Sequence, residues 1–241
     1  MAGLFYALGR QAAPSILKAK WMLHALTGNK RDIVDSEYAL GRHLADIYEK
    51  DVGLAGLAEA DERLGRIGRR LAERLKNKEL RFHFKSDAAD EANAIALPGG
   101  FIYMSLPLYR LCDCEDELGF VLAHEMAHVV RGHASKRFLS SIAANAVSKA
   151  GIRGSPAHRA LRDMLVKVMV RGYNRGQEFE ADDFAASLTR AAGFDPRSGV
   201  LVLKKMREDQ PAPGGVLNEY FSTHPSADER VSRILSKGGK S

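Results

Sequence analysis

The chain has 241 residues, which is enough for one large domain or two small ones. Hydrophobic residues make up 45% and charged residues 27%, a balance typical of soluble globular proteins. This balance argues against disorder, a collagen-like fibre and a disulfide-stabilised miniprotein. The net charge of +6 is modest and comes from scattered Lys and Arg, so a nucleic-acid partner is not expected.

The first 26 residues carry an interrupted apolar stripe. They contain neither a run long enough to cross a membrane nor the basic and apolar regions of a signal peptide. The sequence therefore predicts a cytoplasmic protein, with peripheral membrane contact through residues 1–26 as the alternative. Residues 1–35 are interpreted as an N-terminal amphipathic helical segment and residues 36–241 as one domain. The two cysteines, Cys112 and Cys114, are too close in sequence to favour a disulfide and have no second pair to complete a metal site.

Hydrophobic periodicity predicts the remaining elements in chain order. Helices are expected over 36–50 and 54–76, followed by a strand at 81–85. Residues 94–97 and 101–105 are typical of a strand pair joined by the turn Pro98-Gly99-Gly100. After this pair every pattern is helical, over 106–112, 115–131, 134–150, 158–172, 175–192, 197–209 and 227–236. The sequence thus predicts a mainly helical α+β fold with a small β-sheet.

The segment LGFVLAHEMAHVV, residues 118–130, is apolar on all sides and predicts a buried helix. Its one formal charge is Glu125, which is costly to bury without compensation. His124 and His128 lie one helical turn apart on the same face, so their rings can converge on one metal ion. This H-E-x-x-H pattern is typical of a zinc peptidase, in which two imidazoles bind zinc and the Glu takes a proton from water.

A catalytic zinc needs a third protein ligand and an open fourth position. The metzincin arrangement requires Gly and His where this chain has Arg131 and Ala134, so that class is excluded. His133 misses the required spacing by one residue and is interpreted as an exposed or capping histidine. The third ligand is therefore expected from a second helix, and a carboxylate is the usual alternative.

The segment 174–188 offers that second helix. It carries Glu178, Glu180, Asp182 and Asp183. Glu178 and Asp182 share one helical face, so one can bind zinc while the other orients a histidine ring. The residue types alone do not decide between Glu178 and Glu180.

Four motifs together resemble one known family. They are N-A-I-A-L-P-G-G-F-I at 93–102, H-E-M-A-H at 124–128, N-R-x-x-E-x-x-A-D at 174–182 and T-H-P-x-x-x-x-R at 223–230. Their order and spacing are similar to those of peptidase family M48, the gluzincin group that contains HtpX, BepA and the CAAX prenyl endopeptidases. The resemblance covers about residues 36 to 236. Four motifs in the same order and spacing identify a family far more specifically than H-E-x-x-H alone. It implies a zincin-like catalytic domain in which the small β-sheet lies next to the H-E-x-x-H helix.

The resemblance also implies a role for each matching residue. One zinc ion per chain would be bound by His124, His128 and Glu178, with Glu125 as the general base and Asp182 behind a ligand histidine. His224 would lie near the metal, either stabilising the oxyanion or occupying the fourth position in a latent form. Arg175 and Arg230 would support the site or the substrate. An extended polypeptide substrate would add as an extra strand on the edge formed by residues 101–105.

These inferences predict a zinc-dependent metalloendopeptidase that acts on unfolded or damaged proteins in protein quality control. The alternative is a latent, chaperone-like zinc protein whose site is capped by His224. A nucleic-acid-binding module is the least favoured hypothesis. Because the transmembrane helices of HtpX and the repeat domain of BepA have no counterpart in the sequence, the substrate class of a single relative is not transferred.

Overall fold

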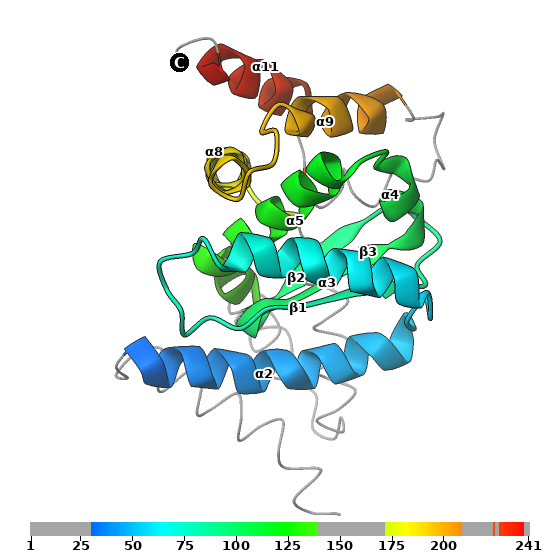
Figure 1. Ribbon diagram of the computed structural model, residues 1–241. Coiled ribbons are helices and arrows are strands. Elements are labelled where there is room, and N and C mark those ends of the chain that lie inside the picture. Colours follow the sequence, from blue (N-terminus) through cyan, green and yellow to red (C-terminus); the bar gives the residue numbers. More distant parts are fainter. Residues whose placement is uncertain (1–29, 139–171, 209–223, 225–226, 239–241) are drawn as a thin grey trace, which may run out of the picture.

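The computed structural model describes residues 30–138, 172–208, 224 and 227–238 (Figure 1). Its helices are α2 (Lys30–Asp51), α3 (Ala58–Ala72), α4 (Leu106–Leu111), α5 (Glu115–Val130), α8 (Arg175–Ala191), α9 (Ser198–Glu208) and α11 (Ala227–Gly238). Its strands are β1 (His83–Asp87), β2 (Ala94–Leu97) and β3 (Phe101–Ser105), with the short 3₁₀ helix η1 (Pro98–Gly100) between the last two. The expected mainly helical α+β fold with a small sheet is confirmed. Residues 1–26 and most of the helices expected over 134–150 and 158–172 lie outside the described residues.

The three strands form one mixed sheet in the order β1-β3-β2. β2 and β3 pair antiparallel as expected, whereas β1 pairs parallel to β3 from His83↔Phe101 to Asp87↔Ser105. The prediction that a substrate adds to residues 101–105 is therefore wrong, because β3 is hydrogen-bonded on both sides. The sequence pattern shows that 94–97 and 101–105 form a pair, but it does not show to which of the two strands β1 adds. The two edges of the described sheet are β1 and β2.

Helix α2 lies against the turn between β2 and β3. A Cβ atom at Gly41 would overlap the carbonyl of Pro98, and one at Gly99 would lie 2.6 Å from the Cα of Tyr38. Gly99 also has a φ of 76°, a left-handed conformation that favours glycine. The glycines thus allow a close approach of helix and turn. Because α2 begins at Lys30, the expected boundary between residues 35 and 36 falls inside this helix.

The sheet is covered on both faces, and its side chains alternate between two cores. One face packs on α2 (Figure 1) and carries Ile95, Leu97, Phe101 and Tyr103. The other face packs on α3 and α5 and carries Ala94, Ala96, Ile102 and Met104. Burial on both faces explains why each residue of β2 and β3 is buried.

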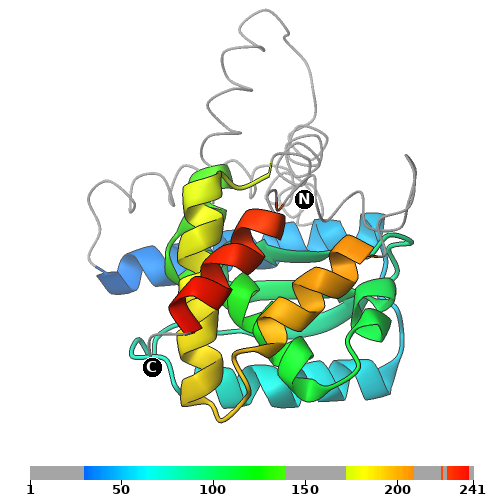
Figure 2. The same cartoon turned by 90° about the horizontal axis from the view of Figure 1, so that it is seen from above.

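Helix α5 is enclosed between the sheet and the C-terminal helices. Helices α8, α9 and α11 lie together on the side of α5 that faces away from the sheet (Figures 1 and 2). Residues 117–129 of α5 are buried without interruption, as the apolar pattern predicted. Among the described helices, none is long and apolar enough to cross a membrane.

Candidate metal centre

Helix α5 brings three polar side chains into the protein interior. His124 is 1% exposed, and Glu125 and His128 are fully buried. The first turn of the helix is acidic, which favours the positive end of the helix dipole, and the helix ends at Val130. The two histidines extend from one face of the helix, and the residues of its last three turns are apolar apart from them and Glu125. Such burial of polar groups requires partners from neighbouring elements.

Helix α8 supplies the acidic partners. Its first turn is fixed by a capping box in which Asn174 accepts a hydrogen bond from the amide of Gln177 and Gln177 accepts one from the amide of Asn174. Glu178 and Asp182 are fully buried against α5. Glu180 instead keeps 46% of its side chain exposed. The structure therefore places Glu178 beside the two histidines of α5, whereas Glu180 lies at the surface.

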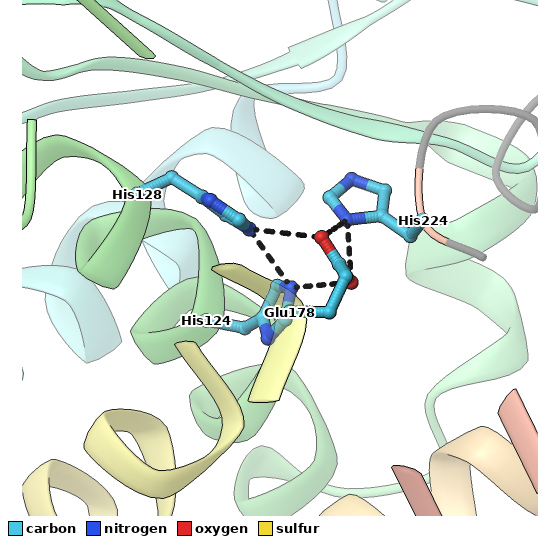
Figure 3. Close-up of side chains that lie close together, drawn as sticks. All are labelled: His124, His128, Glu178 and His224. Atoms are coloured by element: carbon cyan, nitrogen blue, oxygen red, sulfur yellow. Dashed lines mark hydrogen bonds and ion pairs between the residues drawn. The ribbon is translucent and has the colours of Figure 1, made fainter. Parts of the chain in front are cut away.

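Four buried side chains meet at one point (Figure 3). The Nε2 atoms of His124 and His128 are 3.1 Å apart, and the Glu178 carboxylate lies 3.5 Å and 3.4 Å from them. Nδ1 of His224 lies 3.1 Å from Glu178. One donor atom from each residue lies within 4.8 Å of all the others, so the cluster can hold a metal ion. Imidazole nitrogens combined with a carboxylate are a donor set that zinc prefers.

Asp182 and Arg230 lie behind His124. Oδ1 of Asp182 is 3.0 Å from Nδ1 of His124, on the side of the ring opposite the cluster. Arg230 is fully buried, donates to both oxygens of Asp182 at 2.8 Å and lies 3.2 Å from Glu178. Burial would raise the pKa of Asp182, but Arg230 and His124 outweigh it and lower the value to about 2. Burial and Arg230 would lower the pKa of His124, but Asp182 and Glu178 outweigh them and raise it to about 9.

A different set of residues lies behind His128. Its Nδ1 is 3.1 Å from Nδ1 of His133, and the other ring nitrogen of His133 lies 3.3 Å from Glu180. The ring of Tyr173 stacks on His128 with centroids 3.5 Å apart and planes 10° apart. Burial lowers the pKa of His128 well below its usual value. The described residues around His128 thus hold it as a neutral imidazole.

The interpretation of His133 as an exposed or capping residue is wrong, since the side chain is only 3% exposed. Gly132 has a φ of 68° and follows the end of α5, so the chain reverses and returns His133 toward the helix. A glycine directly after an apolar helix is the one signal that indicates such a return. The metzincin spacing rule concerns residues that bind the metal directly. It does not address a residue such as His133, which contacts a metal ligand on the side away from the metal.

Within the described part of the chain, neither carboxylate oxygen of Glu125 has a hydrogen-bond partner. Nε2 of His224 lies 3.5 Å from Oε1 of Glu125. Burial raises the pKa of Glu125 above the usual range of a glutamate. The carboxyl lines a small pocket together with Asn93, Tyr173 and His224. Sequence reasoning did not single out Tyr173, because one aromatic residue before a helix has no distinguishing pattern.

The two arginines expected to support the site occupy different environments. Arg230 is buried within it, as described above. Arg175 keeps 63% of its side chain exposed, pairs with Glu229 at 2.6 Å and lies over the ring of Phe179. None of these contacts involves the four clustered residues, so the structure does not bring Arg175 to the centre.

An H-E-x-x-H helix packed on a helix that supplies a buried glutamate defines the metal centre of a zinc metallopeptidase. The family model of peptidase family M48 matches residues 58–237, and the chain belongs to this family. Zinc is the cofactor of these metallopeptidases, and the donor atoms of the cluster fit it.

Named proteases are among the relatives of the chain. It is 27% identical over 222 residues to the beta-barrel assembly-enhancing protease of Yersinia pestis, a match that covers 86% of this chain and 45% of the relative. It is 29% identical over 156 residues to the mitochondrial metalloendopeptidase OMA1 of Saccharomyces cerevisiae, covering 63% and 45%. It is 25% identical over 212 residues to the metalloprotease YcaL of Escherichia coli, covering 80% and 81%. The match thus spans less than half the length of the first two relatives.

Proposed function

We propose that the chain is a zinc endopeptidase that hydrolyses peptide bonds in extended segments of unfolded or damaged proteins. His124, His128 and Glu178 hold the metal in this proposal, and Glu125 is the general base. The observation that carries it is the fully buried Glu125 carboxylate, which has no hydrogen-bond partner in the described residues and lies beside His224 of the metal-binding cluster. A buried carboxyl without a partner destabilises the fold, and a catalytic role explains its presence.

In the proposed reaction each side chain of the site has a separate role. Zinc held by His124, His128 and Glu178 would supply Lewis acidity to polarise the scissile carbonyl and to make water easier to deprotonate. Glu125 accepts the proton of the attacking water and then delivers it to the leaving amine. Burial raises the pKa of Glu125, which makes its carboxylate a stronger base for the proton of water. Asp182 keeps the ring of His124 oriented throughout.

We propose that the substrate chain pairs with β2. This strand forms an edge of the described sheet and packs directly on α5. Ala94 and Ile95 line the same small pocket as Glu125. An extended peptide paired with this edge would pass in front of the general base.

Cleavage of casein by the zinc-loaded protein tests the proposal. Substitution Glu125→Gln removes the base and keeps the size of the side chain, so we expect it to retain zinc and to lose roughly 10²- to 10⁴-fold in activity. Glu117→Gln is the matched control, because Glu117 is a buried glutamate of the same helix that pairs with Lys205 away from the cluster. We expect that variant to keep its cleavage rate. Equal cleavage by wild type and Glu125→Gln would refute the role of the base.

A second candidate function is a latent, chaperone-like zinc protein. One observation favours it, since His224 is 1% exposed and Nδ1 lies 3.1 Å from Glu178, where it can act as a fourth ligand. If His224 caps the metal, His224→Ala should cleave casein while zinc-loaded wild type does not. If the endopeptidase proposal is correct, wild type cleaves and His224→Ala does not exceed it.

A further inference from the structure

The hydroxyl of Tyr173 is buried and has no hydrogen-bond partner among the residues that the structure describes. Burying a hydroxyl without a partner lowers the stability of a protein, and such groups are rare in folded structures. Tyr103 shows the usual arrangement, since its buried hydroxyl donates to Glu49 at 2.7 Å. The exception at Tyr173 therefore requires an explanation that its own contacts do not supply.

The environment of Tyr173 indicates a ligand. Its ring is stacked on His128, a residue of the metal-binding cluster, and is 4% exposed. It lines the small pocket that also contains Asn93 and Glu125. The side-chain oxygen of Asn93 and both carboxylate oxygens of Glu125 likewise have no hydrogen-bond partners in the part of the chain that the structure describes. One pocket thus collects a hydroxyl donor and several acceptors that have no hydrogen-bond partners among the described residues.

A peptide group complements this set, because its carbonyl accepts a hydrogen bond and its N–H donates one. Stacking on His128 fixes the direction of the hydroxyl before a substrate arrives. A phenol is protonated at neutral pH, so the hydroxyl of Tyr173 is available as a hydrogen-bond donor.

We propose that Tyr173 is a catalytic residue whose hydroxyl donates a hydrogen bond to the carbonyl oxygen of the scissile peptide. This role rests on the endopeptidase function proposed above. The hydrogen bond strengthens as the carbonyl carbon becomes tetrahedral and negative charge develops on its oxygen. Tyr173 keeps its proton during the reaction, while the proton taken from water by Glu125 goes to the leaving amine. The hydroxyl is then a preorganised donor that forms its hydrogen bond in the transition state.

Tyr173→Phe tests this role, because it removes only the hydroxyl and keeps the ring on His128. With zinc-loaded protein and a peptide substrate we expect kcat to fall roughly 10²- to 10³-fold and KM to change little. The melting temperature should stay equal or rise, because a buried group without a partner is removed. Tyr103→Phe is the matched control, and its expected effects are opposite: a lower melting temperature, since Glu49 loses a donor, and unchanged kcat.

A binding measurement separates this proposal from the proposed function. A peptidyl phosphonamidate, a tetrahedral mimic of the transition state, is titrated into zinc-loaded wild type and Tyr173→Phe by calorimetry. We expect binding to Tyr173→Phe to be about 10- to 100-fold weaker, with the same zinc content. If wild type fails to cleave but this difference persists, the endopeptidase function fails and the role of Tyr173 at the pocket stands. Equal phosphonamidate affinity, or a Tyr173→Phe variant that melts lower and loses zinc, would overturn the proposal.

Discussion

The two histidines of α5 occupy equivalent positions on one helix face, yet they are held in opposite ways. His124 contacts Asp182, a carboxylate whose charge is balanced by the buried Arg230. His128 contacts a second imidazole, His133, which in turn reaches Glu180 at the surface. The first arrangement is ionic and fully buried. The second begins with neutral rings and ends in a carboxylate that is 46% exposed.

The difference matters because a zinc-binding imidazole must be neutral and correctly oriented. When Nε2 of His128 faces the metal, its Nδ1 carries the proton and donates to Nδ1 of His133. The proton of His133 then lies on Nε2 and is donated to Glu180. His124 instead donates from Nδ1 to Asp182, without an intermediate. A direct ionic partner makes His124 the more basic of the two ligands. The chain of hydrogen bonds from His128 through His133 to Glu180, called the relay below, leaves His128 neutral.

Removing Arg230 should give the largest effect. Arg230→Met removes a buried cation that contacts the carboxylates of Asp182 and Glu178 and leaves them to His124, so we expect the metal-free protein to lose about 3–5 kcal/mol of stability. Urea unfolding of the metal-free protein measures this loss. Arg175→Met is the matched control, since Arg175 is 63% exposed, and its effect should stay within about 0.5 kcal/mol. Similar losses for the two variants would contradict the buried ionic arrangement.

The basicity of His124 should appear as proton release on zinc binding. With a pKa of about 9, His124 is protonated in the metal-free protein at neutral pH, whereas the lowered pKa of His128 leaves that ring neutral. Zinc must therefore displace about one proton, and its apparent affinity should rise about tenfold per pH unit up to the pKa of His124. Calorimetry in buffers of different ionisation enthalpy measures the release.

Asp182→Asn tests whether Asp182 causes the proton release that accompanies zinc binding. The substitution removes a carboxylate that raises the pKa of His124, so proton release at neutral pH should decrease and the pH dependence of zinc affinity should weaken. Affinity above the pKa of His124 should still fall about 10- to 100-fold, because the ring loses its charged hydrogen-bond partner. Unchanged proton release would show that Asp182 does not control His124.

Features that depend on local periodicity were predictable from the sequence. The hairpin strands were placed correctly at 94–97 and 101–105, because a turn signal joins two short apolar runs. Helix α5 was placed to within one residue at its C-terminal end, because its apolar pattern continues on all sides. Glu178 was reached only through the resemblance, since four acidic residues on one helix are chemically equivalent until packing buries two of them.

Contacts that form only when the fold brings separate parts of the chain together were not predictable from the sequence. The central position of β3 follows from the parallel addition of β1, which no local pattern encodes. His133 reaches His128 only because the chain reverses at Gly132, and Tyr173 reaches the same ring from a distant part of the sequence. Residues that contact a metal ligand from behind share no fixed spacing with it, so motif rules do not find them.

Changes in the relay behind His128 should have smaller effects than those behind His124. His133→Phe keeps an aromatic ring but removes the acceptor for Nδ1 of His128, and we expect about a tenfold loss of zinc affinity. His133→Asn keeps an acceptor near the position of Nδ1 and should recover most of that loss. Competition with a chelator measures both. An asparagine variant as weak as the phenylalanine variant would argue for packing instead of hydrogen bonding.

The end of the relay should have the smallest effect. Glu180 is half exposed and shares its charge with Arg131 at 3.2 Å, so water can replace it as the acceptor for His133. Glu180→Gln should therefore lower zinc affinity by no more than about threefold, far less than Asp182→Asn. If both variants lose affinity equally, the two histidines are held with equal strength, and exposure of the final carboxylate does not weaken the relay.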